Sequence, residues 1–246
     1  SHILINFTIK TELLLFTKNK LGILTICILL FIYGLILFSN LFNLNILESG
    51  YANLDTFFKL SPIIFLLYIP AISMGSFSEE LKNETIDILL SKPLSTLKLV
   101  LGKFFAVYFL IIISIIPTVI YPITIYFLGE EVGNLDLGAI IGSYLGLLLL
   151  CSAIVSISIF CSSMTSNQLN AYIFSVLLSL ISFYGFDLFS QLIENGSISL
   201  IIQKIGMFHY YELLSKGLIS FRDIVYFISI TYLFILSSEN IISKKL

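Results

Sequence analysis

The sequence predicts an all-α, polytopic integral membrane protein with six transmembrane helices in a single domain, residues 1–246. Three observations lead to this prediction. Hydrophobic residues make up 58% of the chain and charged residues only 11%, against roughly 25% charged in an ordinary soluble domain. The mean hydropathy of +1.04 would require a larger core than 246 residues can enclose in water. Charged residues are also separated by long apolar runs, and about 20 apolar residues suffice for one helical span.

These charge-free runs give the positions of the spans. The run 137–186 is too long for one helix, and it divides at the polar turn 162–168. Pro117 and Pro122 are expected to kink the third span. The six spans are expected near residues 21–39, 60–78, 97–128, 137–161, 168–186 and 222–242.

Two further segments do not fit a span. Residues 3–18 are amphipathic but too polar to cross, so we expect an interfacial helix lying on the membrane. Residues 187–221 are moderately apolar and carry several charges, which makes them too long for a simple connection. We expect them to form short helices on the outer face, before the last span.

Basic residues predict the orientation. With six spans, nine basic residues fall on one side of the membrane and four on the other. The positive-inside rule places the larger group in the cytoplasm, so both termini are expected there. The nine are Lys10, Lys18, Lys20, Lys82, Lys92, Lys98, Lys103, Lys244 and Lys245, and the four are Lys59, Lys204, Lys216 and Arg222.

The most informative segment is the charged stretch 79–93, between the second and third spans. Its apolar positions 81 and 88–90 fall on one side of a helix and its charges cover most of the rest, which predicts an amphipathic cytoplasmic helix at 79–92. Ser78 is expected to cap this helix and Pro93 to end it, with Glu79 and Glu80 at its positive N-terminus. A helix of this kind is suited to docking a partner. The alternative is a solvated loop, charged for topology alone.

The next span is expected to begin close to this segment. Ser95 is its predicted N-cap, and Lys98 and Lys103 are predicted to anchor it at the cytoplasmic interface.

The residues here also carry a family resemblance. The run Phe77-Ser-Glu-Glu-Leu-Lys-Asn-Glu-Thr-Ile-Asp-Ile-Leu-Leu-Ser-Lys-Pro-Leu-Ser, followed by Leu101-Gly-Lys, resembles the pattern of ABC-2 type transporter permeases. More narrowly, the chain is similar to the gliding-motility-associated ABC transporter permease subunit of Bacteroidetes-type bacteria. Further blocks carry that narrower resemblance: Gly133-Asn-Leu-Asp136, Gly142-Ser-Tyr-Leu-Gly146, Ser163-Met-Thr-Ser-Asn-Gln168, Tyr184-Gly-Phe-Asp187 and the stretch 216–227.

The resemblance implies specific roles. Residues 3–18 would be the elbow helix, and residues 79–92 the coupling helix that sits in a groove of a separate ATP-binding cassette ATPase subunit. It also implies a homodimer or a heterodimer with a second permease, in the bacterial cytoplasmic (inner) membrane. The residues implied to contact the ATPase are Glu79, Glu80, Thr85, Leu89 and Pro93.

The chain itself offers no sequence signature of an enzyme. Leu101-Gly-Lys-Phe lacks the first glycine and the Ser/Thr of the phosphate-binding motif, so ATP and Mg²⁺ are expected in the partner and no cofactor in this chain. His2 and His209 lie far apart, which argues against a metal site. The three cysteines show no C-x-x-C spacing and are interpreted as small apolar residues. No long basic run points to nucleic acid.

The leading interpretation is therefore the membrane subunit of an exporter with a hydrophobic or amphipathic cargo. A second is a non-transporting scaffold that anchors an ATP-binding partner to a motility or secretion machine. An ion-coupled carrier is the third, and it is disfavoured because such carriers place ionisable residues near the middle of the membrane.

Overall fold

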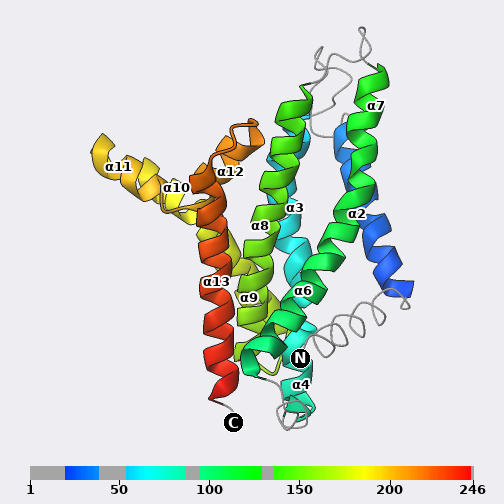
Figure 1. Ribbon diagram of the computed structural model, residues 1–246, viewed down its shortest axis with the longest axis vertical. Helices are drawn as coiled ribbons and strands as arrows, with labels where there is room; N and C mark the ends of the chain where they lie inside the picture. The colour runs from blue at the N-terminus through cyan, green and yellow to red at the C-terminus, as the bar shows by residue number, and fades with distance from the viewer. Residues whose placement is uncertain (1–19, 39–53, 87–94, 129–135, 245–246) are drawn as a thin grey trace.

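The computed structural model describes residues 20–38, 54–86, 95–128 and 136–244, and within these ranges every regular element is helical. Figure 1 shows an elongated bundle of helices running along the long axis, with a short arm that projects sideways from one end. The elements are α2 (Lys20–Phe38), α3 (Asp55–Ser73), α4 (Gly75–Lys82), α6 (Thr96–Ile115), η3 (Ile116–Val119), α7 (Ile120–Leu128), α8 (Leu137–Met164), α9 (Gln168–Leu180), η4 (Ile181–Gly185), α10 (Phe186–Gln191), α11 (Gly196–Gln203), α12 (Met207–Ser215) and α13 (Phe221–Ser243).

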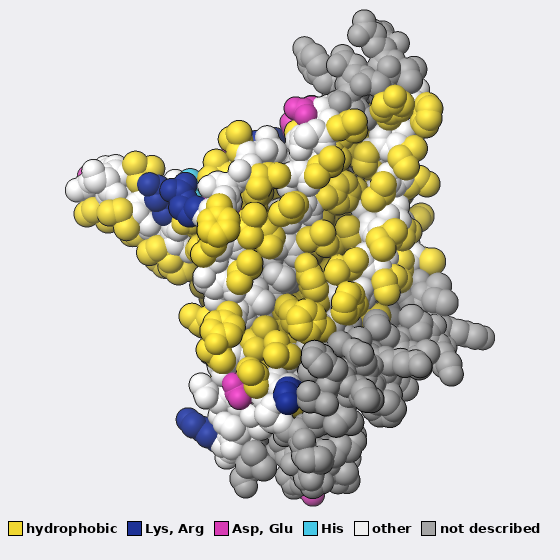
Figure 2. All heavy atoms as spheres, viewed as in Figure 1, with side chains coloured by type: hydrophobic (Ala, Val, Ile, Leu, Met, Phe, Trp, Pro, Cys, Tyr) yellow, Lys and Arg dark blue, Asp and Glu magenta, His cyan; other side chains and the backbone are white. Residues whose placement is uncertain are grey.

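Five helical segments of the described chain are long and apolar enough to cross a membrane. Together they make this a multi-pass membrane protein. Figure 2 shows hydrophobic side chains covering the middle of one face, with most of the charged side chains of that face nearer its ends or on the arm. The five segments are Asp55–Lys82, Thr96–Phe127, Leu137–Met164, Gln168–Gln191 and Phe221–Ser243.

The remaining expected span, 21–39, coincides with α2, of which residues 25–36 form a shorter apolar helix. Helix α2 packs on the bundle, because Tyr33 donates a hydrogen bond to Ser61 of α3 and Tyr121 of α7 donates one to the Leu30 carbonyl. That α2 crosses the membrane stays a prediction. The expected elbow helix, 3–18, lies outside the described residues.

Helix α8 is the central element. It contacts α3, α4, α6, α9, α12 and α13, and its C-terminal half is almost entirely buried. Serine, alanine and glycine are frequent along it, and such small side chains allow helices to approach closely within a membrane. It ends at Met164, and Asn167 caps α9 by accepting a hydrogen bond from the Leu169 amide, so the polar turn 162–168 does reverse the chain.

Two spans contain irregular turns. Span α6–η3–α7 tightens into a 3₁₀ segment at Pro117, whereas Pro122 lies inside α7 without a break. The effect of Pro117 is expected, because proline removes one backbone donor and crowds the preceding turn. Span α9–η4–α10 contains a π-helical segment at Ile181–Gly185, just before the chain leaves the bundle for the arm.

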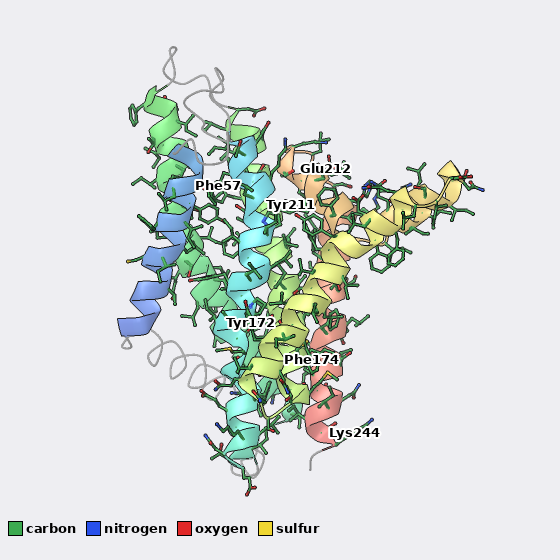
Figure 3. The ribbon with its side chains drawn as sticks, turned by 180° about the vertical axis from the view of Figure 1, so that it is seen from behind. Phe57, Tyr172, Phe174, Tyr211, Glu212 and Lys244 are labelled. Atoms are coloured by element: carbon green, nitrogen blue, oxygen red, sulfur yellow. The ribbon has the colours of Figure 1, made fainter. Side chains whose placement is uncertain are left out.

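The segment 187–221 does form short helices, α10 to α12, before the last span. Helices α10 and α11 pack on each other and form the arm (Figure 1), while α12 lies against α8 and α3. Tyr211 of α12 donates a hydrogen bond of 2.6 Å to the Phe58 carbonyl, close to Phe57 in Figure 3. Burial raises the pKa of the Tyr211 phenol well above its usual value.

Helix α4, the turn between α8 and α9, the start of α6 and the end of α13 all lie at one end of the bundle, which we call the α4 end. Lys244, just after α13, marks it in Figure 3. The arm and α12 lie at the opposite end.

Candidate functional site at helix α4

Helix α4 continues the direction of α3 after a local break at Met74 (Figure 1). Its residues Gly75 to Lys82 extend the second span to Lys82, and the charged stretch therefore begins inside a helix. Phe77 is fully buried, so the helix is held on the bundle by its apolar side as well as by the polar contacts described next.

The strongest of these contacts is a buried ion pair. Lys103 of α6 is only 4% exposed, and its ammonium nitrogen lies 2.6 Å from the Glu80 carboxylate. The same ammonium group donates to the Ser76 carbonyl and lies 4.9 Å from the centre of the Phe77 ring. A lysine with this little access to water needs such partners, because an unpaired buried charge costs several kcal/mol. The pair fixes α4 to α6.

Two further contacts join α4 to the turn between α8 and α9. The Ser162 hydroxyl accepts hydrogen bonds from the backbone amides of Phe77 and Ser78, at 2.9 and 3.1 Å. It donates to the Met74 carbonyl at 2.8 Å. Gln168, at the start of α9, donates to the Glu79 carboxylate at 2.6 Å. Helix α4 is thus attached to three other helices at once.

The chain turns sharply after α4. Glu84 has a φ of 55°, in the left-handed region that non-glycine residues seldom adopt, and the Thr85 amide donates to the Glu80 carbonyl at 3.0 Å. Lys82, Asn83, Glu84 and Thr85 are exposed, whereas Ile86 is buried. We call residues 82–85 the tip. It presents charged and polar groups beyond the end of the apolar bundle.

Several details of the expected coupling helix are wrong. Ser78 does not cap a helix start; it lies within α4, and its hydroxyl donates to the Met74 carbonyl at 2.5 Å. Glu79 and Glu80 occupy the last turn of α4 and not a first turn, so the helix N-terminus does not stabilise them. The reason is that the second span does not end at residue 78 but continues as helix to Lys82. Residues 87–94 lie outside the described ranges. They include Leu89, Pro93 and the C-terminal part of the expected helix 79–92.

The start of the third span is partly as expected. Ser95 is the N-cap residue of α6, with an extended backbone, but its side chain makes no capping hydrogen bond. Lys103 was expected to anchor the helix in the membrane interface and instead points into the protein toward Glu80. Its ammonium group pairs with the Glu80 carboxylate of α4 and has almost no access to water.

A family model for the ABC-2 family transporter protein matches residues 45–238, well over half of the chain. The chain belongs to the ABC-2 transporter family. Among curated proteins, none matches the chain. The matched range covers every helix from α3 to α12 and most of α13, so α4 and its contacts are part of the ABC-2 membrane domain itself.

Sequence reasoning about this ABC-2 permease missed three residues of the site. Lys103 belongs to the Leu101-Gly-Lys motif, and a lysine about two turns inside an apolar helix is a signal that it has a carboxylate partner. Gln168 ends the Ser163–Gln168 block that carries the narrower resemblance. Ser162 gives no signal, because it is one of many serines in α8 and only the fold shows what it contacts.

Outside this site, one charged residue of the permease is unusual. Asp223, in the first turn of α13, is fully buried, and in the described part of the chain neither carboxylate oxygen has a hydrogen-bond partner. Across the same ranges, no group of three or more His, Cys, Asp or Glu side chains is arranged to hold a metal ion.

Proposed function

We propose that this ABC-2 permease is the membrane subunit of an exporter driven by a separate ATP-binding cassette ATPase, which docks on the segment 79–93. The observation that carries the proposal is the position of α4. It extends a membrane span, ends in an exposed polar tip, and is attached to α6, α8 and α9, so a force on the tip is passed to three helices. In the proposed orientation, the α4 end faces the cytoplasm.

The roles of the contact residues follow from their positions. Glu79 and Thr85 are exposed and remain candidates for contact with the ATPase, together with Leu89 and Pro93 of the adjoining segment. Glu80 is half-buried and paired with Lys103, so its larger role is to hold α4 in place. Glu84 becomes a new candidate, since it is exposed at the turn.

The proposed function has three further parts: a cellular role, an assembly and a class of cargo. The resemblance of several sequence blocks to gliding-motility-associated permeases supports a role in motility or secretion, in a bacterial cytoplasmic membrane. Two permease copies, or this chain and a second permease, would act with two ATPase subunits. An export cargo of hydrophobic or amphipathic character fits a bundle whose spans carry few charges, chiefly near their ends.

The experiment is co-expression with a candidate ATP-binding cassette subunit from the same genome, followed by co-purification. Glu79→Lys combined with Glu84→Lys reverses the charge of the exposed surface without touching the buried pair, and it is expected to reduce recovery of the ATPase at least fivefold. Removing one partner of a buried, hydrogen-bonded charge pair at an interface costs about 2–5 kcal/mol, so charge reversal at two contact positions is expected to exceed a fivefold loss of recovery. Glu194→Lys, at an exposed position of the arm, is the matched control. Recovery equal to wild type in the double variant would contradict docking on this surface.

A further inference from the structure

The break between α3 and α4 contains a side chain from another helix. In a regular helix the Ser78 amide would donate to the Met74 carbonyl. Here the Ser78 amide donates to the Ser162 hydroxyl instead. The Met74 carbonyl accepts hydrogen bonds from the Ser162 hydroxyl and the Ser78 hydroxyl. A side chain inserted into the backbone ladder in this way is one of the known causes of a helix bend. Ser162 therefore completes the backbone hydrogen bonds of a joint that is 84–88 residues away in sequence.

These bonds use the full capacity of the hydroxyl. A serine side chain offers one donor and two acceptor positions, and all three are occupied. Ser162 is fully buried, so no water replaces a bond that is lost. Helix α4 can therefore tilt at Met74 only if it breaks these bonds or carries the end of α8 with it.

A second contact acts in the same direction. Gln168, the first residue of α9, donates to Glu79, two residues after Phe77. Ser162 and Gln168 thus attach α4 to both helices that the turn connects, α8 and α9.

Helix α8 leads from this joint to the opposite end of the bundle. Near its start, Ser143 donates a hydrogen bond of 2.8 Å to the Ser215 carbonyl at the end of α12. Gly142 there faces Gly217, and a Cβ added to Gly142 would lie 2.9 Å from the Gly217 Cα. A displacement of α8 along its axis or by rotation would therefore reach α12 and the following loop.

We propose that Ser162 is a positioning residue that transmits movement of α4 into α8 and α9. This inference rests on the proposed function, in which an ATP-binding subunit moves α4. It assigns a role to the 162–168 turn. Movement of α4 then reaches the opposite end of the bundle through α8 as well as through α3, which is directly connected to α4.

The test uses the permease with its ATP-binding subunit in lipid nanodiscs, in a Cys27→Ser background that removes the exposed cysteine. Spin labels at Glu84 and Ser166, both exposed, report the distance between the tip and the turn. In wild type the tip and the turn move as one unit, so ATP leaves this distance unchanged. In Ser162→Ala the tip moves alone, so ATP changes the label distance, and stimulation of ATP hydrolysis by the permease falls about fivefold while ATPase binding is retained.

Control variants separate this role from a purely structural one. Ser156→Ala removes a buried hydroxyl of α8 that donates to the Ala153 carbonyl of its own helix, and this variant is expected to behave as wild type. Ser162→Thr keeps the hydroxyl and is expected to restore the wild-type response. Gln168→Ala changes only a half-buried side chain, and it provides the same measurement should Ser162→Ala fail to fold.

The outcomes distinguish the proposed function from the role of Ser162. If wild-type permease neither binds nor stimulates the ATPase, the proposed function fails. If wild type does both, and Ser162→Ala and Gln168→Ala show the wild-type distance response and stimulation, the role of Ser162 is overturned and the proposed function stands.

Discussion

The ammonium nitrogen of Lys103 lies 2.6 Å from the carboxylate of Glu80, and this pair joins the start of the third span to the end of the second. From the sequence, Glu80 was expected to be a docking carboxylate of the charged segment 79–93, and Lys103 was expected to anchor the third span at the membrane interface. The structure uses them instead to fix α4 to the bundle. The surface offered to a partner is consequently the tip, 82–85, together with Glu79.

We predict that breaking this pair destabilises the protein strongly. Glu80→Gln leaves the Lys103 ammonium buried without its carboxylate, and loss of one partner of a buried pair typically costs about 3–5 kcal/mol of unfolding free energy. The measurement is thermal or denaturant unfolding in detergent. Glu212→Gln is the control, because its pair with Lys216 is largely exposed and worth at most about 0.5 kcal/mol. Equal effects of the two variants would contradict the burial of the Lys103 pair.

We predict that Asp223→Asn stabilises the protein. The carboxylate is fully buried, and neither of its oxygens has a partner among the described residues, so the charged form is costly there. The favourable effect of the helix N-terminus recovers only about 0.3–1 kcal/mol. Removing the charge is expected to raise the unfolding free energy by about 1–3 kcal/mol. A lower unfolding midpoint for Asp223→Asn would show that the carboxylate has a stabilising contact.

We predict that Gly217→Ala is destabilising and Gly196→Ala is not. Gly217 has a φ of +76°, and a Cβ there would lie 2.7 Å from the Ala139 Cα, so both backbone strain and a clash result. Gly196 has no atom within 4 Å of the corresponding position. The expected loss for Gly217→Ala is about 2 kcal/mol or more, from the usual costs of overpacking and strain. Comparable melting temperatures for the two variants would contradict the close packing of the 216–220 loop on α8.

We predict the membrane orientation from the nine-to-four distribution of basic residues. Single cysteines at Asn83 and Asn167, at the α4 end, should be protected from an impermeant thiol reagent added to intact cells. A cysteine at Asn195, in the arm, should react with it. The three positions are exposed in the structure, so access alone does not decide the result. Labelling of position 83 from outside would reverse the orientation and remove the tip from the cytoplasm.

Charge-free runs located the five segments that are long and apolar enough to cross a membrane, because such runs follow from the cost of burying charge in a bilayer. The sixth expected span stays a prediction. The turn at 162–168 was found for the same reason. The end of the second span was misjudged, since Ser78, Glu79 and Glu80 are polar enough to suggest a membrane boundary.

The side-chain contacts that hold α4 on the bundle could not be predicted from the sequence. Glu80 and Lys103 are 23 residues apart, and Ser162 lies more than 80 residues from the backbone that it binds. Such pairings depend on how α3, α6 and α8 pack, and no local pattern encodes that packing. The orphaned Asp223 was missed because an acidic residue in a first helical turn has an ordinary local explanation.

Docking of a separate ATP-binding subunit on the tip would bring that subunit into contact with residue 84. Cross-linking from a photoreactive amino acid at Glu84, in membranes that contain the ATPase subunit, measures this contact. Glu194, exposed at the opposite end, is the control position. Docking on the tip predicts a cross-link between the permease and the ATPase from position 84 and none from position 194. Absence of the product at 84, or equal products at both positions, would contradict it.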